Sequence, residues 1–255
     1  MAGEIDVIVG TPICRCTSFV LDKFLANQQE IQQVYPACTL VLATDEPDFV
    51  AELEEQVSHY HLKGEVIIYE TVKPDYARSR IWSIVCGREA LRQHVLSQEA
   101  DLFLSLDGDM VFDTSVISIL KSKVGECEVA FGGYYMPRSD IIGFGAGCVM
   151  ISREILSKFS FTCYEFSNGE EIDDGEMLDL SLFKCRAKVN KGIFLPIKHY
   201  SNSQEYYSIE PQAVSWFRRM ANSMTVRYVL VRVSIMAKSN IPRKLKALLC
   251  KVPKI

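Results

Sequence analysis

The sequence lacks several features that would place it in a common protein class. No uninterrupted apolar run reaches the roughly 20 residues that a membrane-spanning helix needs, so a transmembrane protein is not expected. The N-terminal segment carries an acid where a secretory signal would be basic, which argues against a signal peptide. No P-loop and no ordered Ser-His-Asp set is visible. With 48% hydrophobic and 24% charged residues, the composition is that of a globular protein rather than a disordered or fibrous one.

Cysteine pairs at zinc-binding spacing are also absent. The nine cysteines include no CxxC pair, and Cys14 and Cys16 form a lone CxC. An odd number of cysteines, scattered through a chain too long to need disulfides, indicates reduced and mostly buried thiols. The sequence therefore predicts a cytoplasmic protein.

Basic charge is concentrated at the end of the chain. The 255 residues carry a formal net charge of −4, yet residues 200–255 hold 10 Lys+Arg against 2 Asp+Glu. We therefore expect one domain over residues 1–203 and a basic, partly amphipathic extension over residues 204–255. The extension suits the surface of an anionic membrane, and a helix packed on the domain with a solvated basic face is the alternative. Nucleic acid is not an expected partner, because the body is acidic and has no recognition motif.

Short β-rich runs alternate with helical patterns along the first 200 residues. Several strand runs are apolar without strict alternation, as expected for strands buried on both faces. The predicted class is an α/β protein with a mainly parallel central sheet that helices cover on both sides. Such sheets bind ligands at the carboxyl ends of their strands. The expected strands are 4–10, 38–44, 65–70, 101–106, 128–133, 147–152 and 192–197, and the expected longer helices are 18–35, 46–60, 77–97, 115–123 and 174–189.

Two carboxylates follow the predicted strand 101–106. Asp107 and Asp109 are separated only by Gly108, and alternate residues of an extended segment point the same way. The glycine allows a ligand to approach the backbone closely. Hard divalent cations such as Mg²⁺ and Mn²⁺ bind one or two carboxylates together with substrate phosphates. The alternative is that one of these acids caps the next helix and the other is solvated. Asp113 or Thr114 can already serve as that cap, which weakens this alternative.

The stretch LFLSLDGDMVFD resembles the D-x-D stretch of GT-A fold glycosyltransferases, especially the inverting, family-2-like enzymes. The resemblance covers roughly residues 4–201 and implies a Rossmann-like α/β/α sandwich. It also implies a nucleotide-diphospho-sugar donor. In this family the two carboxylates, here Asp107 and Asp109, contact the donor ribose and a divalent metal that bridges the diphosphate.

Further segments resemble the donor side of that family. Thr11 and Pro12 end the first strand where the family has a loop beside the nucleotide base. Asp45 follows the second strand, where an acid often contacts the base or ribose, although an Asx-turn or a helix cap would explain it equally well. Arg78 and Arg80 lie at the expected start of the long helix, where cations oppose the helix dipole, so a diphosphate or a pairing with nearby acids would explain them.

The acceptor side is expected in a glycine-rich stretch. Gly145, Ala146 and Gly147 belong to a run that resembles the family's lining of the acceptor cleft. A dinucleotide-binding loop is rejected, because that loop opens a helix whereas this run precedes a strand. A glycine-rich turn without a ligand is the remaining alternative.

The general base is expected in the acidic stretch 170–186. Inverting transfer needs a carboxylate that takes the proton from the acceptor hydroxyl. The family places a Glu-Asp pair at the start of this helix, and matching the helix tail puts Asp179 at the first acid but Leu180 at the second. Asp173 and Asp174 are the other candidates, and the sequence does not choose among the three. Acids near a helix start also complement its dipole without any catalytic role.

His199 follows the last predicted strand, where the family often has a histidine that completes metal or diphosphate binding. A neutral imidazole is an apt third ligand beside carboxylates, particularly for Mn²⁺. The sequence thus predicts a Mn²⁺- or Mg²⁺-dependent transferase acting on a glycan, lipid-linked or small-molecule acceptor. A non-catalytic nucleotide or sugar binder is one alternative. A nucleotidyltransferase is the other, although the loop after the first strand lacks the glycines such an enzyme needs.

Overall fold

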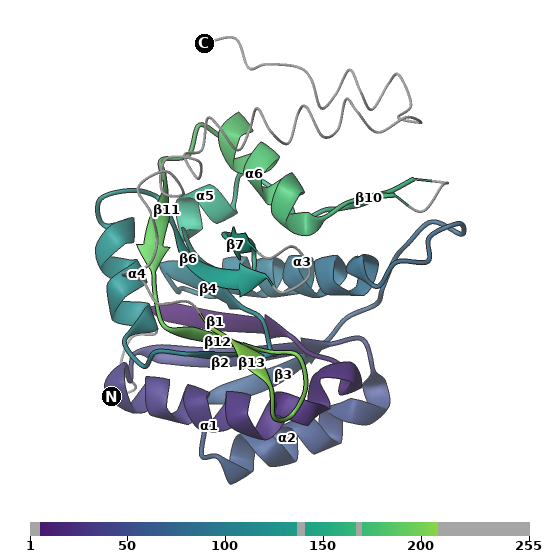
Figure 1. The fold of residues 1–255 in the computed structure, drawn as a ribbon, viewed down its shortest axis with the longest axis vertical. Coiled ribbons are helices and arrows are strands. Elements are labelled where there is room, and N and C mark those ends of the chain that lie inside the picture. Colours follow the sequence, from purple (N-terminus) through teal and green to yellow (C-terminus); the bar gives the residue numbers. More distant parts are fainter. Residues whose placement is uncertain (1–5, 137–140, 167–169, 209–255) are drawn as a thin grey trace.

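The computed structural model describes residues 6–136, 141–166 and 170–208. A central sheet in the order β11-β6-β8-β4-β1-β2-β3 is covered by helices on both faces (Figure 1). Its strands are β1 (Val7–Pro12), β2 (Cys38–Thr44), β3 (Gly64–Ile68), β4 (Leu102–Leu106), β6 (Val129–Met136), β8 (Cys148–Ser152) and β11 (Val189–Phe194), and β7 (Ile141–Gly143) pairs with β6. The helices are α1 (Ser18–Val34), α2 (Val50–His59), α3 (Ile81–Ser97), α4 (Val116–Val124), α5 (Arg153–Leu156) and α6 (Asp174–Lys184).

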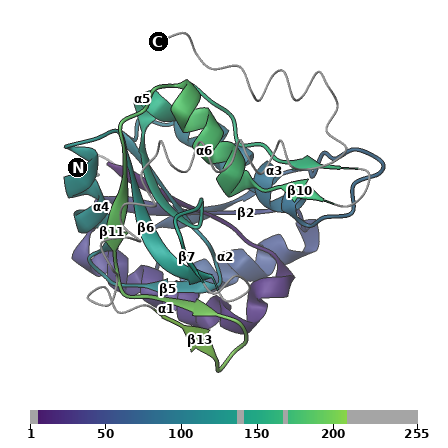
Figure 2. The same ribbon diagram turned by 45° about the horizontal axis from the view of Figure 1, so that its top comes forward.

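Smaller elements flank this sandwich. A second sheet joins β5 (Met110–Phe112), β12 (Ile197–Tyr200) and β13 (Tyr206–Tyr207), and it lies at the lower edge of the molecule in Figure 2. A two-stranded ribbon of β9 (Tyr164–Glu165) and β10 (Glu171–Ile172) lies beyond the start of α6. Short 3₁₀ turns at Arg15–Thr17 and Pro47–Phe49 precede α1 and α2.

The parallel strands at the centre of the sheet bring their carboxyl ends to one edge. β1 pairs in parallel with both β2 and β4, so that Val9 lies opposite Leu40 and Leu104. β8 runs antiparallel to β4 and places Cys148 opposite Leu106. The residues just before β8 therefore lie beside those just after β4. This register brings the glycine-rich stretch next to the D-x-D turn.

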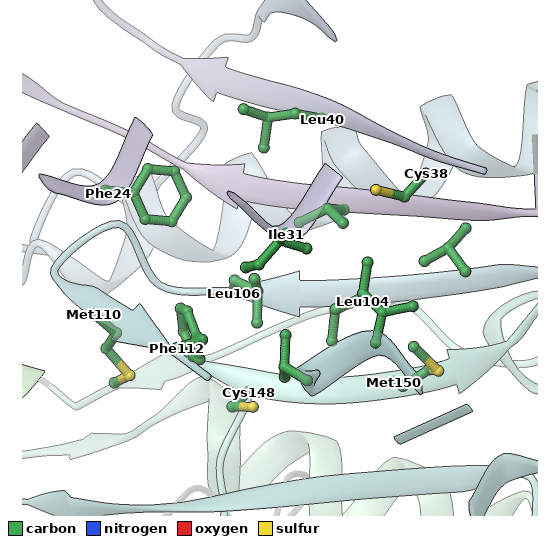
Figure 3. Close-up of a cluster of buried hydrophobic side chains, with 14 of the residues drawn as sticks. Phe24, Ile31, Cys38, Leu40, Leu104, Leu106, Met110, Phe112, Cys148 and Met150 are labelled. Atoms are coloured by element: carbon green, nitrogen blue, oxygen red, sulfur yellow. The ribbon is translucent and has the colours of Figure 1, made fainter. Parts of the chain in front are cut away.

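Alternate side chains of the buried strands build two apolar layers. Leu104 points into the layer beneath α1, α2 and α4, whose side chains include Phe24 (Figure 3). Phe103 points into the opposite layer, which α3, α5 and α6 cover and which contains Leu91. Both faces of the sheet are thus packed, as the continuous apolar runs predict.

The predicted α/β sandwich with a mainly parallel sheet is confirmed, and two element boundaries are corrected. The helix expected over 174–189 ends at Lys184, because Arg186 adopts a left-handed backbone with φ of 57°. The strand expected over 192–197 is replaced by two strands, β11 and β12, in different sheets. As a result, His199 lies within β12 and pairs with Met110 of β5.

The start of α3 is also corrected. The helix expected from residue 77 begins at Ile81. The backbone N–H groups of Arg78 and Ser79 donate to the Glu165 carboxylate at 2.8 and 3.0 Å. Trp82 donates to the same carboxylate through Nε1 at 3.1 Å. A carboxylate thus already occupies the turn that precedes the helix.

The proposed extension lies largely outside the described residues. Residues 209–255 are not described, so their predicted amphipathic character and membrane contact stay predictions. Within the described part, β13 lies beyond the expected boundary at residue 203 and pairs with β12. None of the described helices has the length and apolar character that crossing a bilayer requires.

Candidate functional site

A cavity of about 370 Å³ opens at the carboxyl edge of the sheet. The β1–α1 loop, α3, the D-x-D turn, the glycine-rich stretch and the start of α6 contribute its walls. The predicted site residues that line it are Pro12, Arg80, Asp107, Gly108, Asp109, Gly145, Ala146, Gly147, Asp173 and Asp174. The structure therefore brings together most of the residues that the sequence singled out on separate segments.

The D-x-D turn is fixed by its backbone and by close packing. The Asp107 N–H donates to the Gly147 carbonyl at 3.0 Å, and the Met110 N–H donates to the Asp107 carbonyl at 3.3 Å. A Cβ at Gly108 would lie 2.7 Å from Cδ1 of Ile13, so a side chain there would displace the end of the Ile13 side chain that packs against the turn.

Asp109 presents a free oxygen beside a histidine. Its Oδ1 is buried and has no hydrogen-bond partner, whereas its Oδ2 lies 3.5 Å from Nε2 of His199. The other ring nitrogen of His199, Nδ1, is 2.9 Å from the Tyr135 carbonyl, which orients the ring. Burial alone would lower the pKa of His199, but the Asp109 carboxylate and the Tyr135 carbonyl outweigh it and raise that pKa.

These two side chains fit part of a cation shell. Among the described residues no group of three or more His, Cys, Asp or Glu side chains converges as a ready-made metal cage. A carboxylate that has one unpartnered buried oxygen and whose other oxygen lies near an imidazole nonetheless fits Mn²⁺ or Mg²⁺, which usually completes its shell with phosphate oxygens and water. The third predicted ligand, Asp107, is instead engaged by an arginine.

That arginine is Arg88, which sequence reasoning missed. Arg88 is only 3% exposed, and its guanidinium pairs with Asp107 through one terminal nitrogen and with Asp174 through the other. Burial raises the pKa of Asp107 and Arg88 counters this by lowering it, with the net pKa remaining above the ordinary value. A signal was available in the sequence, because Arg88 interrupts the apolar stripe of α3 between Val85 and Leu91.

The three candidate bases occupy different environments. Asp173 caps α6 by accepting the Glu176 N–H at 2.7 Å, and Asp174 in the first turn is 9% exposed and pairs with Arg88. Both line the cavity. Asp179 lies more than a turn further along, is fully buried and pairs with Lys191, so it does not line the cavity.

Three predicted donor contacts lie outside the cavity lining. Thr11 is fully buried within β1. Asp45 accepts hydrogen bonds from Thr71 at 2.5 Å and from Ser83 at 2.9 Å. The Arg78 guanidinium donates to the backbone carbonyls of its own turn at 3.0 and 3.2 Å. Of the two predicted arginines, only Arg80 lines the cavity.

The β1–α1 loop differs from the expectation of reduced thiols. Cys14 and Cys16 are joined by a disulfide, so the expectation does not hold for this pair. The other cysteines of the described residues are free thiols. Cys14 lines the cavity, and the Arg80 guanidinium lies 3.1 Å from Sγ of Cys16.

The glycine-rich stretch leaves no room for side chains beside the D-x-D turn. A Cβ at Gly147 would overlap the Asp107 carboxylate and lie 2.8 Å from its Cγ. A Cβ at Gly145 would lie 2.8 Å from the Tyr134 hydroxyl. Because Arg88 holds the Asp107 carboxylate, that carboxylate cannot turn aside without losing its ion pair. These glycines therefore shape the wall of the cavity.

Replacing Gly147 by alanine should consequently destabilise the protein. We expect Gly147→Ala to lower the free energy of unfolding by about 1–3 kcal/mol, the usual cost of overpacking. Urea unfolding followed by circular dichroism measures this change. Gly192→Ala is the matched control, because a Cβ there meets its nearest atom at an ordinary 3.5 Å. Equal stability of the two variants would contradict the packing described for Gly147.

Comparison with known proteins supports the fold. No protein-family model matches the sequence, and no curated protein is significantly similar to it. A mannosyltransferase from Pyrobaculum calidifontis, solved with GDP-Man and Mn²⁺, is similar in structure with a TM-score of 0.55 and 13% identity, over 97% of this chain and 69% of the other. S. aureus TarS with UDP-GlcNAc matches at a TM-score of 0.49 and 12% identity, over 96% of this chain and 70% of the other. The likeness to the first structure shows that this chain has a GT-A-like fold.

Proposed function

We propose that this chain is a metal-dependent glycosyltransferase that moves a sugar from a nucleotide-diphospho-sugar to an acceptor hydroxyl with inversion. The observation that carries the proposal is the Asp109 carboxylate, whose buried Oδ1 has no hydrogen-bond partner and whose Oδ2 lies 3.5 Å from Nε2 of His199. These groups lie at the ligand-binding edge of a GT-A-like sheet, next to the cavity that Asp174 lines. A structure of similar fold holds GDP-Man and Mn²⁺.

In the proposed reaction, the donor binds at the D-x-D turn. Asp109 and His199 would hold Mn²⁺ or Mg²⁺, which when bound neutralises the charge of the leaving diphosphate. Arg80 lines the same cavity and adds a guanidinium, which suits phosphate oxygens. Arg88 pairs with Oδ1 of Asp107, and Oδ2 of this carboxylate would contact the donor ribose.

The acceptor half uses the start of α6. Asp174 would take the proton from the acceptor hydroxyl, and its ion pair with Arg88 holds the carboxylate at the cavity wall. Gly145, Ala146 and Gly147 line the cavity beside Asp107, where the acceptor would bind. Asp179 is not proposed as the base, because it is buried against Lys191 outside the cavity lining. The proposed acceptor is a glycan, a lipid-linked sugar or a small molecule.

The test is a screen of nucleotide sugars for Mn²⁺-dependent release of nucleoside diphosphate. We expect at least one donor to be turned over, and turnover to fall when Mn²⁺ is chelated. Asp109→Asn should weaken Mn²⁺-dependent nucleotide binding at least about tenfold, as loss of a metal contact usually does. Calorimetric titration with UDP or GDP measures this.

The control variant is Asp113→Asn. Asp113 lies on the same segment, but it accepts hydrogen bonds from Ser115 outside the cavity lining, so nucleotide affinity should not change. The proposal fails if no donor is turned over, or if Asp109→Asn binds nucleotide and Mn²⁺ as tightly as the unaltered protein.

A further inference from the structure

The loop between β1 and α1 carries two bonded cysteines at the wall of the cavity. Cys14 is half-buried and lines the cavity, whereas Cys16 is exposed. The two are joined by a disulfide and are separated by one residue. The Arg80 guanidinium, which lines the same cavity, lies 3.1 Å from Sγ of Cys16. The disulfide is therefore accessible to solvent at Cys16, lines the cavity at Cys14, and lies beside a cation that lines the same cavity.

The setting of this pair differs from that of most other cysteines. Burial raises the pKa of Cys38 to about 11 and the pKa values of Cys148 and Cys163 to about 12. Thiols in such surroundings are inert, because the reactive species is the thiolate. A thiol at position 16 would instead lie beside a guanidinium and close to solvent, which are the surroundings that favour a thiolate.

We propose that Cys14 and Cys16 are a redox-active pair that interconverts between disulfide and dithiol by exchange with a small thiol such as glutathione. We further propose that this exchange controls how strongly Arg80 binds an anionic ligand in the cavity. The second part rests on the proposed function, because the anion there is the diphosphate of a nucleotide.

The exchange is balanced by two glutathione molecules. The first attacks one sulfur as a thiolate and breaks the Cys14–Cys16 bond, which gives a mixed disulfide and one cysteine thiolate. Cys16 is the favoured leaving group because Arg80 lies beside its sulfur. The second glutathione thiolate attacks the mixed disulfide and releases the remaining cysteine together with glutathione disulfide. Both cysteines are reduced and two glutathione thiols are oxidised. One thiol proton ends on Cys14 and the other passes to solvent, because Cys16 remains a thiolate beside Arg80.

The two states differ in what Arg80 faces. In the disulfide state a neutral sulfur lies beside the guanidinium, so its charge is available to a phosphate group in the cavity. In the dithiol state a Cys16 thiolate pairs with Arg80 and competes with that phosphate. An exposed ion pair of this kind should weaken nucleotide binding by about two- to fivefold.

The first experiment tests the pair without any ligand. The full-length protein is equilibrated in glutathione buffers of increasing reducing strength and then alkylated, and the modified cysteines are identified by mass spectrometry. We expect Cys14 and Cys16 to become alkylated together, and only in the reducing buffers. Cys86→Ser is the control, since it removes a half-buried free thiol elsewhere and should leave this transition in place. Alkylation of both residues in every buffer would overturn the disulfide.

The second experiment tests the coupling to Arg80. Affinity for UDP or GDP with Mn²⁺ is measured by calorimetry on the oxidised and the reduced protein. We expect weaker binding in the reduced state, and no difference between the states in Cys14→Ser/Cys16→Ser or in Arg80→Met. Equal affinity of the two states in the unaltered protein would overturn the coupling. If neither state binds a nucleotide, the proposed function fails, and the alkylation result alone decides whether the pair is redox-active.

Discussion

Arg88→Met is expected to reduce turnover at least about 100-fold, the loss that follows when reacting groups move by about an ångström. Arg88 is the only cation paired with either Asp107 or Asp174 in the described ion pairs, and it is 3% exposed. Without Arg88, neither Asp107 nor the proposed base Asp174 is held in position by an ion pair to this guanidinium. Turnover at saturating donor and acceptor measures the effect.

The same substitution should also lower stability. Removing one partner of a buried ion pair costs about 3–5 kcal/mol, because the remaining charge is left unpaired. Burial already raises the pKa of Asp107, so this carboxyl is destabilising when ionised. When the pKa of a carboxyl is higher in the folded than in the unfolded state, the folded state binds the proton more readily. The free energy of unfolding therefore rises as pH falls through the folded-state pKa. The difference in free energy of unfolding between the unaltered protein and Arg88→Met should therefore shrink as pH falls towards about 4, the ordinary pKa of a carboxyl group.

Two variants separate these effects from general damage to α3. Arg92→Met removes the arginine one turn further along, which pairs with Glu89 outside the cavity lining, and it should leave turnover unchanged. Arg88→Lys keeps the charge but cannot reach two carboxylates through a planar fork, so it should recover only part of the turnover. Full turnover in folded Arg88→Met would contradict the positioning role.

Asp179→Asn is expected to lower the free energy of unfolding by about 3–5 kcal/mol, because it removes the carboxylate that pairs with the buried Lys191 ammonium. Asp179 is fully buried and Lys191 is 5% exposed. Lys191 also donates to the Phe144 carbonyl at 3.2 Å and lies 4.2 Å from the centroid of the Phe131 ring. The ion pair thus ties α6 and β11 to the glycine-rich wall. Urea unfolding measures the loss.

A double variant distinguishes this structural role from a catalytic one. Replacing a buried ion pair by apolar side chains of similar size is often neutral for stability. Asp179→Leu/Lys191→Met should therefore unfold near the midpoint of the unaltered protein and retain turnover at saturating donor. Asp174→Asn should instead lose turnover while remaining folded. A stable but inactive double variant would return Asp179 to the list of candidate bases.

The strands and helices were largely predictable because their signals are local. The apolar runs of β1, β2 and β4 and the periodic patterns of α1 and α3 depend only on neighbouring residues. The position of Asp107 and Asp109 at the ligand-binding edge followed from one rule about parallel sheets. The strand expected over 192–197 was wrong because its partners, β6 and β5, lie in different sheets, which no local pattern records.

Which side chains line the cavity was less predictable from the sequence. Thr11, Asp45 and Arg78 were predicted as donor contacts from their places at element ends, but none of them lines the cavity. Thr11 is fully buried, and Asp45 and Arg78 make hydrogen bonds elsewhere. Arg88 was not predicted as a site residue, although the sequence shows a single arginine among the apolar residues that form the buried face of α3. Which side chains face a cavity depends on the helix phase, and α3 begins four residues later than its pattern indicates.

By itself, the sequence determined the α/β alternation, the buried parallel strands and two carboxylates at the end of one of them, because burial and backbone preference act on adjacent residues. Tertiary structure decided that Arg88 joins Asp107 to Asp174, that His199 lies beside Asp109, and that Asp179 is a buried partner of Lys191. These pairs come from segments far apart in the chain. Their distances are set by how sheets and helices pack, and charge pairing acts only once packing has brought the groups together.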